Sequence, residues 1–305
     1  MKKHILIIAV IFFTITAKSQ QNPQYTQYVY NMNIINPAYA GSKEALSLNF
    51  LARTQWVGID GAPQTLTFGG HSPLGKNLGL GLSVIIDEIG PVKEQNIYAD
   101  ISYTLNLKND AKLAFGLKAG VTAFNLCLEC LVSVDTESQD FLNRAANKTL
   151  PNIGAGLFYY TNKFYLGFAM PNLLETFHFE KTGNQITNGS EKTHFFLNSG
   201  YVFDVSRDVK LKPSMMVKAA QGAPLSIDLS GNVLIYEKME FGLSYRVSES
   251  VSALVNVRAK KNLRIGYAYD HTLTTLGDFN SGSHEIFLLF DFEAARNKIR
   301  SPRFF

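Results

Sequence analysis

Two cysteines are the first residues in this sequence that could do chemistry. Cys127 and Cys130 form a CxxC pair, and the chain has no other cysteine. A zinc site would need two further ligands, yet the nearest histidine is His178. Redox activity would need a thioredoxin-like βαβ context, which the flanking residues lack. We therefore predict a disulfide that staples an exposed loop in an oxidising compartment.

The acidic residues and the histidines offer weaker candidates. Asp135, Glu137 and Asp140 resemble a calcium loop, but Asp140 occupies the sixth position, where glycine is required. Asp270 and His271 would suit a Ser/His/Asp hydrolase, but the sequence has no GxSxG or HExxH motif. We expect the three acidic residues to lie in a solvated loop, and Asp270 and His271 to be a polar pair at a strand end. We expect no enzymatic activity, metal or cofactor.

The composition and the N-terminus indicate an exported protein that is less charged than ordinary soluble domains. The 305 residues are 46% hydrophobic and 18% charged, against roughly 25% charged in ordinary soluble domains. The first 19 residues combine a basic start, an apolar run from Ile5 to Phe13 and the small-x-small site Ala17-Lys18-Ser19. This pattern predicts a signal peptide over residues 1–19, whereas a retained anchor would need about 20 apolar residues.

Charge argues against a nucleic-acid partner. Removal of residues 1–19 takes away three lysines and no acidic residue, so the formal net charge falls from +4 to +1. Nucleic-acid binding requires a clustered basic face, and the mature chain has no such excess. We therefore expect no nucleic-acid partner.

The elements that would position these residues are strands. From residue 209 apolar side chains alternate with Lys210, Lys212 and Lys218, which is the period of two of a half-exposed strand. The same pattern predicts fourteen strands, near 45–52, 64–70, 78–86, 96–107, 112–125, 152–160, 164–170, 193–203, 209–219, 225–236, 238–247, 250–258, 262–270 and 283–292. No later stretch has 18 uninterrupted apolar residues. These features predict an all-β fold, a transmembrane antiparallel β-barrel. Closure of the barrel gives every backbone N–H and C=O group a hydrogen-bond partner in lipid.

Connection lengths distinguish this barrel from a soluble β-sandwich. The expected connections at 53–63, 87–95, 126–151, 171–192 and 271–282 follow odd-numbered strands and are long, while most of the others are short. Bacterial barrels have short periplasmic turns and longer external loops. If both termini are periplasmic, the long connections face outside, and a sandwich has no reason to sort its loops in this way.

The polar face of each strand should line the lumen, because a cation facing lipid costs about 2 to 4 kcal/mol at the midplane. This places eight basic residues inside: Lys112, Lys118, Lys210, Lys212, Lys218, Arg246, Arg258 and Arg264. Asp100, Asp228 and Glu240 share that face and can balance them. Six glycines also fall on it, at positions 79, 81, 116, 120, 154 and 156, and a strand glycine often marks close approach of another backbone.

These glycines lead us to predict that part of the chain lies inside the barrel. The leading candidate is residues 20–43, in which Tyr25, Tyr28, Val29 and Met32 have helical spacing and Asn36-Pro37 stops a helix. A periplasmic arm is the alternative. The expected organisation is a signal peptide (1–19), this plug or arm (20–43), the barrel (44–293) and a periplasmic tail (294–305).

Eight ordered segments resemble the PorP/SprF family of type IX secretion outer-membrane proteins. They are QQNPQYTQYVYNMNIINPAYAGS, RTQWVGIDGAPQTLTFGGHSPL, KLAFGLKAG, KTLPNIGAGLFYYTNKFYLGFAMPNLL, GAPLSIDLSGNVL, FGLSYRVSESVSALV, LRIGYAYDHTL and GSHEIFLLFDF. The chain departs from the family mainly in the loop with the two cysteines and in the tail 296–305.

The resemblance implies a non-enzymatic barrel in the outer membrane that assists export or surface attachment of a large secreted protein, such as a gliding adhesin. It implies type IX secretion components and outer-membrane lipid as partners, and no catalytic residue. Arg53, Trp56 and Asp60 are candidates for partner contact, although interfacial anchoring also explains a lone Trp. The alternative function is a passive porin or small-solute channel, which a charged lumen would permit.

Overall fold

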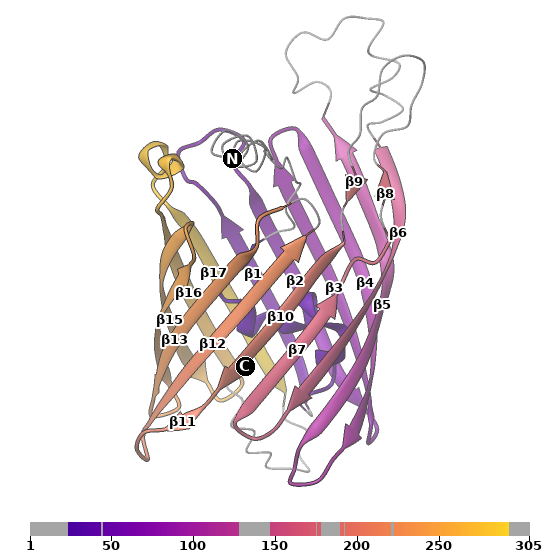
Figure 1. Cartoon of the computed structure of the whole chain (residues 1–305), viewed down its shortest axis with the longest axis vertical. Coiled ribbons are helices and arrows are strands. Elements are labelled where there is room, and N and C mark those ends of the chain that lie inside the picture. Colours follow the sequence, from indigo (N-terminus) through magenta and orange to yellow (C-terminus); the bar gives the residue numbers. More distant parts are fainter. Residues whose placement is uncertain are drawn as a thin grey trace, which may run out of the picture.

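Fourteen antiparallel strands form a closed barrel (Figure 1). The computed structural model describes residues 24–43, 45–127, 147–174, 176–177, 190–191, 193–220 and 223–292. Around the wall the strands are β1 (Leu46–Thr54), β2 (Gln64–Leu74), β3 (Leu78–Ile89), β4 (Val92–Asn106), β5 (Lys112–Leu126), β6 (Asn147–Tyr160), β7 (Phe164–Met170), β10 (His194–Tyr201), β12 (Val209–Ala220), β13 (Ser226–Ile235), β14 (Met239–Arg246), β15 (Ser250–Lys260), β16 (Leu263–Thr272) and β17 (Ser283–Phe292). The predicted fold class and strand number are confirmed.

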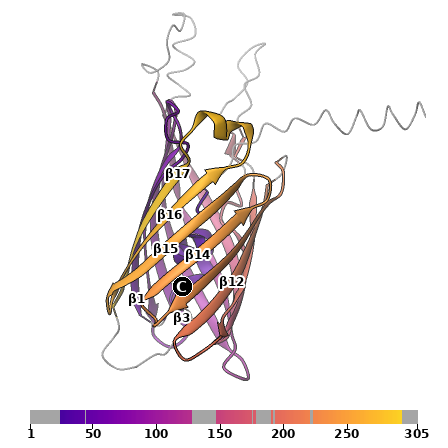
Figure 2. The ribbon, with the colours of Figure 1, turned by 90° about the vertical axis from the view of Figure 1, so that its left-hand side faces the viewer.

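The barrel closes between its first and last strands. β1 pairs with β17 over nine residues, from Leu46 opposite Phe292 to Thr54 opposite His284. On the other side of the wall β10 pairs with both β7 and β12. The strands are tilted against the long axis of the barrel, as Figure 2 shows for β14 to β17.

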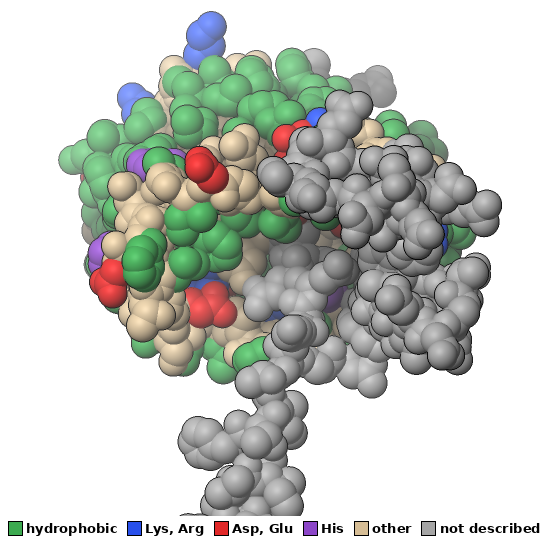
Figure 3. Space-filling view, turned by 90° about the horizontal axis from the view of Figure 1, so that it is seen from above, with side chains coloured by type: hydrophobic (Ala, Val, Ile, Leu, Met, Phe, Trp, Pro, Cys, Tyr) green, Lys and Arg blue, Asp and Glu red, His purple; other side chains and the backbone are tan. Residues whose placement is uncertain are grey.

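The barrel is apolar outside and polar inside. Leu82 and Leu243 are 63% and 66% exposed on the outer face, whereas Lys118 and Glu285 are 2% and 0% exposed on the inner face. Seen from above, hydrophobic side chains cover much of the outer wall (Figure 3). This arrangement follows from the two-residue period of the strands and suits a wall that faces hydrocarbon.

Connection lengths define two ends of the barrel. The short-turn end carries residues 75–77, 107–111, 161–163, 202–208, 236–238 and 261–262. The long-loop end carries the four long connections 55–63, 127–146, 171–193 and 273–282, together with the shorter connections 90–91, 221–225 and 247–249. Within these connections β8 (Thr176–Phe177) pairs with β9 (Ser190–Glu191), and β11 (Phe203–Asp204) adds one short strand beside β12.

The predicted long connection at 87–95 is wrong. β3 continues to Ile89 and β4 starts at Val92, so that only Gly90 and Pro91 separate them. Asp87 lies opposite Glu94, and Glu88 lies opposite Lys93 and forms an ion pair with it. These charged residues resemble a loop in sequence, but here they extend a paired hairpin. Gly90 has φ +55°, which the tight turn requires of it.

The N-terminal segment from residue 24 to 43 lies inside the barrel. It has three short helical turns: η1 (Tyr28–Tyr30), α2 (Met32–Ile35) and η2 (Pro37–Tyr39). Residues 25–40 are all buried. The spacing of Tyr25, Tyr28, Val29 and Met32 therefore does not produce one continuous helix. α2 ends at Ile35, and Asn36 caps η2 by accepting a hydrogen bond from the backbone N–H of Ala38.

None of the helices in the described part of the chain has the length and apolarity that a membrane-spanning helix requires.

Several predicted features lie outside the described residues. These are the signal peptide (1–19), residues 20–23, Cys130, the acidic residues Asp135, Glu137 and Asp140, His178, and the tail (294–305). The predicted disulfide and the division of the chain into four parts therefore stay predictions.

Candidate functional site in the lumen and at its rim

The N-terminal segment crosses the lumen from the long-loop end to the short-turn end. At its start, the side-chain oxygen of Gln24 accepts a 2.7 Å hydrogen bond from Arg246, the last residue of β14. At its finish, Lys43 forms a 3.1 Å ion pair with Asp291, near the end of β17. The wall thus holds the segment at both ends.

Arg53 organises a charged cluster near the long-loop end. Its guanidinium group lies 2.6 Å from Asp270 and 3.2 Å from Glu285, and all three side chains are at most 4% exposed. It also donates a 2.8 Å hydrogen bond to the hydroxyl of Thr26. Glu285 in turn accepts hydrogen bonds from the backbone N–H groups of Thr26 and Gln27, at 2.9 and 2.8 Å. The cluster joins β1, β16 and β17 to the segment.

A second cluster surrounds Glu240 of β14. Lys212 of β12 and Arg264 of β16 lie 2.9 and 3.4 Å from its carboxylate. Asn232 donates a 2.6 Å hydrogen bond to it, and the phenol of Tyr30 donates another. Because Tyr30 belongs to η1, this cluster also connects the wall with the segment.

A third contact binds a backbone carbonyl of the segment. Lys118 of β5 donates a 3.0 Å hydrogen bond to the carbonyl oxygen of Ile34 and forms a 3.4 Å ion pair with Asp100 of β4. Ser102 similarly donates a 2.6 Å hydrogen bond to the carbonyl of Ala40. Wall side chains therefore satisfy backbone groups that a helix would otherwise pair, which explains why the segment is not a continuous helix.

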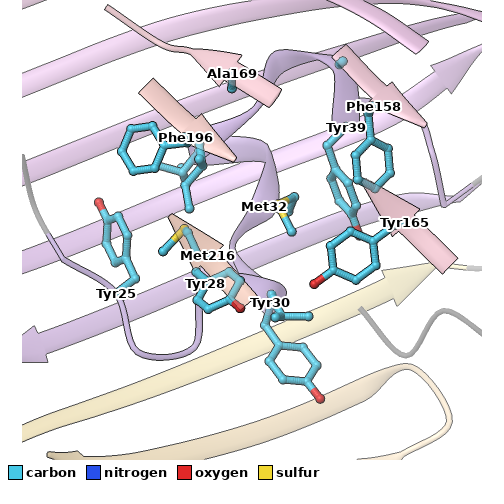
Figure 4. Packing of buried hydrophobic residues seen from close by; sticks show 14 of the residues in the cluster. Tyr25, Tyr28, Tyr30, Met32, Tyr39, Phe158, Tyr165, Ala169, Phe196 and Met216 are labelled. Atoms are coloured by element: carbon cyan, nitrogen blue, oxygen red, sulfur yellow. The ribbon is translucent and has the colours of Figure 1, made fainter. Parts of the chain in front are cut away.

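Apolar contacts fill the space between these polar clusters (Figure 4). Tyr30 stacks on Phe287 of β17 with ring centroids 4.6 Å apart, and Tyr39 meets Phe158 of β6 edge to face at 5.3 Å. Aromatic pairs in these geometries stabilise by about 0.5 to 1.5 kcal/mol beyond burial. The segment is thus packed as a core and is not loosely enclosed.

Wall glycines let the segment approach the strands closely. A Cβ atom at Gly116 would overlap the backbone of Pro37 and Ala38, and one at Gly79 would overlap the carbonyl of Ala40. A Cβ atom at Gly156 would overlap the side chain of Asn36. The prediction that glycines on the polar phase mark close approach of another part of the chain is confirmed at these positions.

The predicted lumen charges lie where the alternation places them. Lys118, Lys212, Lys218, Arg246 and Arg264 are buried, as are Asp100, Asp228 and Glu240. Lys112, Lys210 and Arg258 share the same face but are half-buried near the short-turn end. Arg246 pairs with Asp228 at 2.7 Å. The lumen is therefore charged, and ion pairs and the N-terminal segment lie within it.

The three candidate partner-contact residues differ in their location and burial in the structure. Arg53 was expected in the first connection, but it lies in β1 and its side chain is buried among Thr26, Asp270 and Glu285. Its orientation follows from the alternation of β1, which turns every second side chain inward. Trp56 is half-buried and Asp60 is exposed in the connection 55–63. Only these two are accessible at the rim.

Two connections form a joint platform at this rim. The backbone N–H of Val57 donates to the carbonyl of Gly282 at 2.9 Å, and that of Ser281 donates to the carbonyl of Val57 at 2.8 Å. The backbone N–H of Trp56 donates to the hydroxyl of Ser283. Phe279, in the short helix η3 (Thr275–Phe279), is 74% exposed on this platform.

The adjacent residues Asp270 and His271 point to opposite faces of the wall. Asp270 is buried against Arg53, whereas His271 is exposed on the outside. The structure therefore does not bring them together as an acid–base pair. Among the described residues, no group of three His, Cys, Asp or Glu side chains is placed to hold a metal ion.

The segment's contacts with the wall could not be found from the sequence. The cluster around Arg53 joins residues up to 259 positions apart in the sequence, namely Thr26, Asp270 and Glu285, and no local motif connects them. The only available signals were the inward phase of the charged residues and of the glycines.

Comparison with known proteins gives one family and a set of barrels. A family model described as type IX secretion system membrane protein PorP/SprF matches residues 17–290. No curated protein gives a significant match. Among solved structures, the Acinetobacter baumannii outer membrane protein Omp33 has 9% identity and a TM-score of 0.49, over 82% of this chain and 99% of that chain.

Two further barrels are similar at the same level. The CymD monoaromatic hydrocarbon channel has 12% identity and a TM-score of 0.49, over 88% of this chain and 94% of that chain. A Pseudomonas aeruginosa FadL homologue has 11% identity and a TM-score of 0.48, over 89% of this chain and 95% of that chain. At these identities and TM-scores, the functions of the three proteins have no bearing on this chain.

Proposed function

The chain belongs to the PorP/SprF family of type IX secretion system membrane proteins, and on this basis we propose that it is a non-enzymatic outer-membrane component of that system. It assists the export or the surface attachment of a large secreted protein, such as a gliding adhesin. Its partners are other type IX components, the secreted protein and the surrounding outer-membrane lipid.

The family match carries the proposal, and the packed lumen supports it. Residues 25–40 are buried between the strands. Hydrogen bonds of Thr26 with Arg53 and Glu285 hold one end of the segment on the wall, and the Lys43–Asp291 ion pair holds the other end. A large protein would therefore meet the rim of the barrel, not its interior. Because long loops of bacterial barrels face outward, we place the long-loop end at the cell surface.

Within this rim, the platform of residues 55–63 and 273–282 is the proposed contact surface. Trp56 and Phe279 provide apolar area, and Asp60 and Asp278 provide exposed charge. Aromatic side chains of this kind dominate protein interfaces. Arg53 contributes indirectly, because it binds the segment beneath the platform.

Deletion of the gene in its host tests the proposal directly. We expect one specific large protein to be lost from the cell surface and to appear inside the cell or in the medium, as measured by mass spectrometry of each fraction. Complementation with the wild-type gene is the control. An unchanged set of surface and secreted proteins in the deletion strain would contradict the proposal.

The passive porin or small-solute channel is the alternative, which the charged lumen permits. Single-channel recording of the purified protein in planar bilayers distinguishes the two functions. We expect the full-length protein to give no steady open conductance, because residues 24–43 occupy the lumen. A steady conductance with solute preference in the full-length protein would support the porin.

The route to the membrane is also part of the proposal. Residues 1–19 act as a signal peptide that is cleaved after Ser19. Sequencing of the mature N-terminus from isolated outer membranes checks this step, with Gln20 expected as the first residue.

A further inference from the structure

Every connection at the short-turn end of the barrel carries a basic side chain. The six connections at the short-turn end each contribute one residue to what we call the basic ring: Lys76, Lys108, Lys163, Arg207, Lys238 and Lys261. All six are exposed. Lys260 adds a seventh exposed cation at the end of β15.

The connection residues that the structure describes at the opposite end carry acidic side chains instead. The described connection residues at the long-loop end include no Lys or Arg, whereas Asp60, Glu249 and Asp278 are exposed or half-buried there. Acidic side chains are visible around this rim in Figure 3. Among the described connection residues, the distribution of charge therefore differs between the two ends.

Acidic residues offset the basic ring only in part. The same turns contain Asp110, Asp204, Asp208 and Glu237. Lys163 pairs with Asp204 at 2.9 Å, and this hydrogen bond raises the pKa of Lys163. Three of the six turns, namely 75–77, 161–163 and 261–262, contain no acidic residue at all.

Exposed apolar residues stand directly beside the basic ring. Leu74 is two positions from Lys76 and is 56% exposed, and Val205 and Tyr236 are each two positions from a ring residue and are 65% and 66% exposed. The cations therefore lie at the edge of the apolar band. This is the depth at which lipid phosphate groups meet the hydrocarbon.

We propose that the basic ring binds the phosphate groups of anionic lipids in the adjacent leaflet. A cation in each turn, together with the neighbouring apolar band, fits a partner that surrounds the barrel on all sides. An acidic protein would contact one sector and would leave the other turns without a partner. The inference rests on the membrane location proposed above, but it does not depend on any secreted partner.

Lipid selectivity of the purified full-length protein tests the inference. The protein is reconstituted in phosphatidylcholine vesicles, and the association of spin-labelled phosphatidylglycerol is compared with that of spin-labelled phosphatidylcholine by electron paramagnetic resonance. We expect a preference of about fivefold for the anionic lipid, which is the contribution of about one basic side chain near the surface. The preference should disappear in about 1 M salt, where the screening length is about 3 Å.

Substitution of all six ring residues by glutamine should reduce the preference to about equal binding, since the cations that supply it are gone. The matched control carries Asp60→Asn, Glu249→Gln and Asp278→Asn at the other end and should keep the wild-type ratio. Heat-dependent migration on a gel verifies folding. If the sixfold variant does not fold, two threefold variants, each covering half of the ring, should each lose part of the preference.

Equal retention of the two lipids by the wild-type protein would overturn the inference. An undiminished preference in the sixfold or threefold variants would overturn it as well, because the preference would then come from residues outside the ring. Secretion is not measured in this experiment, so its failure is distinguishable from failure of the proposed function.

Discussion

The carboxylate of Glu285, in the last strand of the barrel, accepts a 2.9 Å hydrogen bond from the backbone N–H of Thr26, which precedes the first strand. The same carboxylate pairs with Arg53 of β1. Lys43 and Ser47 make a similar connection with Asp291 at the other end of β17. The N-terminal segment is thus bonded to both sides of the seam at which the barrel closes, so closure and occupation of the lumen are coupled.

Replacement of Arg53 by glutamine should destabilise the barrel. The change leaves Asp270 and Glu285 buried without their cation, and loss of one partner of a buried ion pair costs about 3 to 5 kcal/mol. We expect a decrease of this size in the free energy of unfolding, measured by urea titration in lipid vesicles. Fluorescence of Trp56, the only tryptophan, reports the transition.

The matched control for this prediction is Lys76→Gln, which removes an exposed cation from a turn. It should change the free energy of unfolding by less than about 0.5 kcal/mol. Equal stability of Arg53→Gln and the wild type would show that the cluster does not hold the segment in place.

Replacement of Gly116 by valine should displace the N-terminal segment from the wall. Any Cβ atom at this position overlaps the backbone of Pro37 and Ala38, and backbone atoms cannot yield as a flexible side chain can. We expect a steady conductance in planar bilayers where the wild type is silent. Gly231→Val is the control, because a Cβ atom there meets nothing within 4 Å. A silent Gly116→Val variant with wild-type stability would contradict this prediction.

The alternation of apolar and polar residues in the sequence was sufficient to predict the barrel. β7 and β17 have the predicted bounds of 164–170 and 283–292, and most other strands differ by a few residues. The failure at 87–95 has a clear physical cause. Asp87, Glu88, Lys93 and Glu94 are polar enough for a loop, but they continue the pairing of β3 and β4 beyond the apolar band.

The arrangement inside the lumen could be predicted only in outline. The alternation in β5, β12 and β14 predicted that their charged side chains point into the lumen, and the strand glycines indicated a nearby backbone. The partners were not readable, because Lys118 binds the carbonyl of Ile34 and Glu240 binds Tyr30 across 84 and 210 positions. Such contacts depend on how the segment folds between the walls, and a two-residue period carries no information about that.

Lys118 and Asp100 should show strong energetic coupling. Their side chains are 3.4 Å apart and fully buried, so that replacing either one alone leaves an unpaired group. We expect Lys118→Met and Asp100→Asn each to lower the free energy of unfolding by about 3 kcal/mol or more. The double variant should lose less than the sum of both, with a coupling energy of about 1 to 3 kcal/mol in a double-mutant cycle. Strictly additive losses would show that the ion pair is unimportant.

Trp56→Ala together with Asp60→Ala should weaken contact with the secreted partner without unfolding the barrel. The side chain of Asp60 is exposed and that of Trp56 is half-buried on the platform, so their removal disturbs few contacts within the wall. Interface aromatics contribute about 2 kcal/mol or more when they are central to a contact. We therefore expect surface retention of the partner to fall several-fold, measured by mass spectrometry of surface-labelled cells, while heat-dependent migration of the barrel stays at the wild-type temperature.

The control for this pair is Asp110→Ala, an exposed acidic residue at the short-turn end, which should leave retention unchanged. Arg53→Gln provides the contrast, because its buried guanidinium group joins the segment to the wall beneath the platform. It should lower retention only in proportion to the loss of folded barrel in the membrane. If the double variant retains its partner fully while Arg53→Gln loses it from a normally folded barrel, the contact surface lies at the lumen entrance and not on the platform.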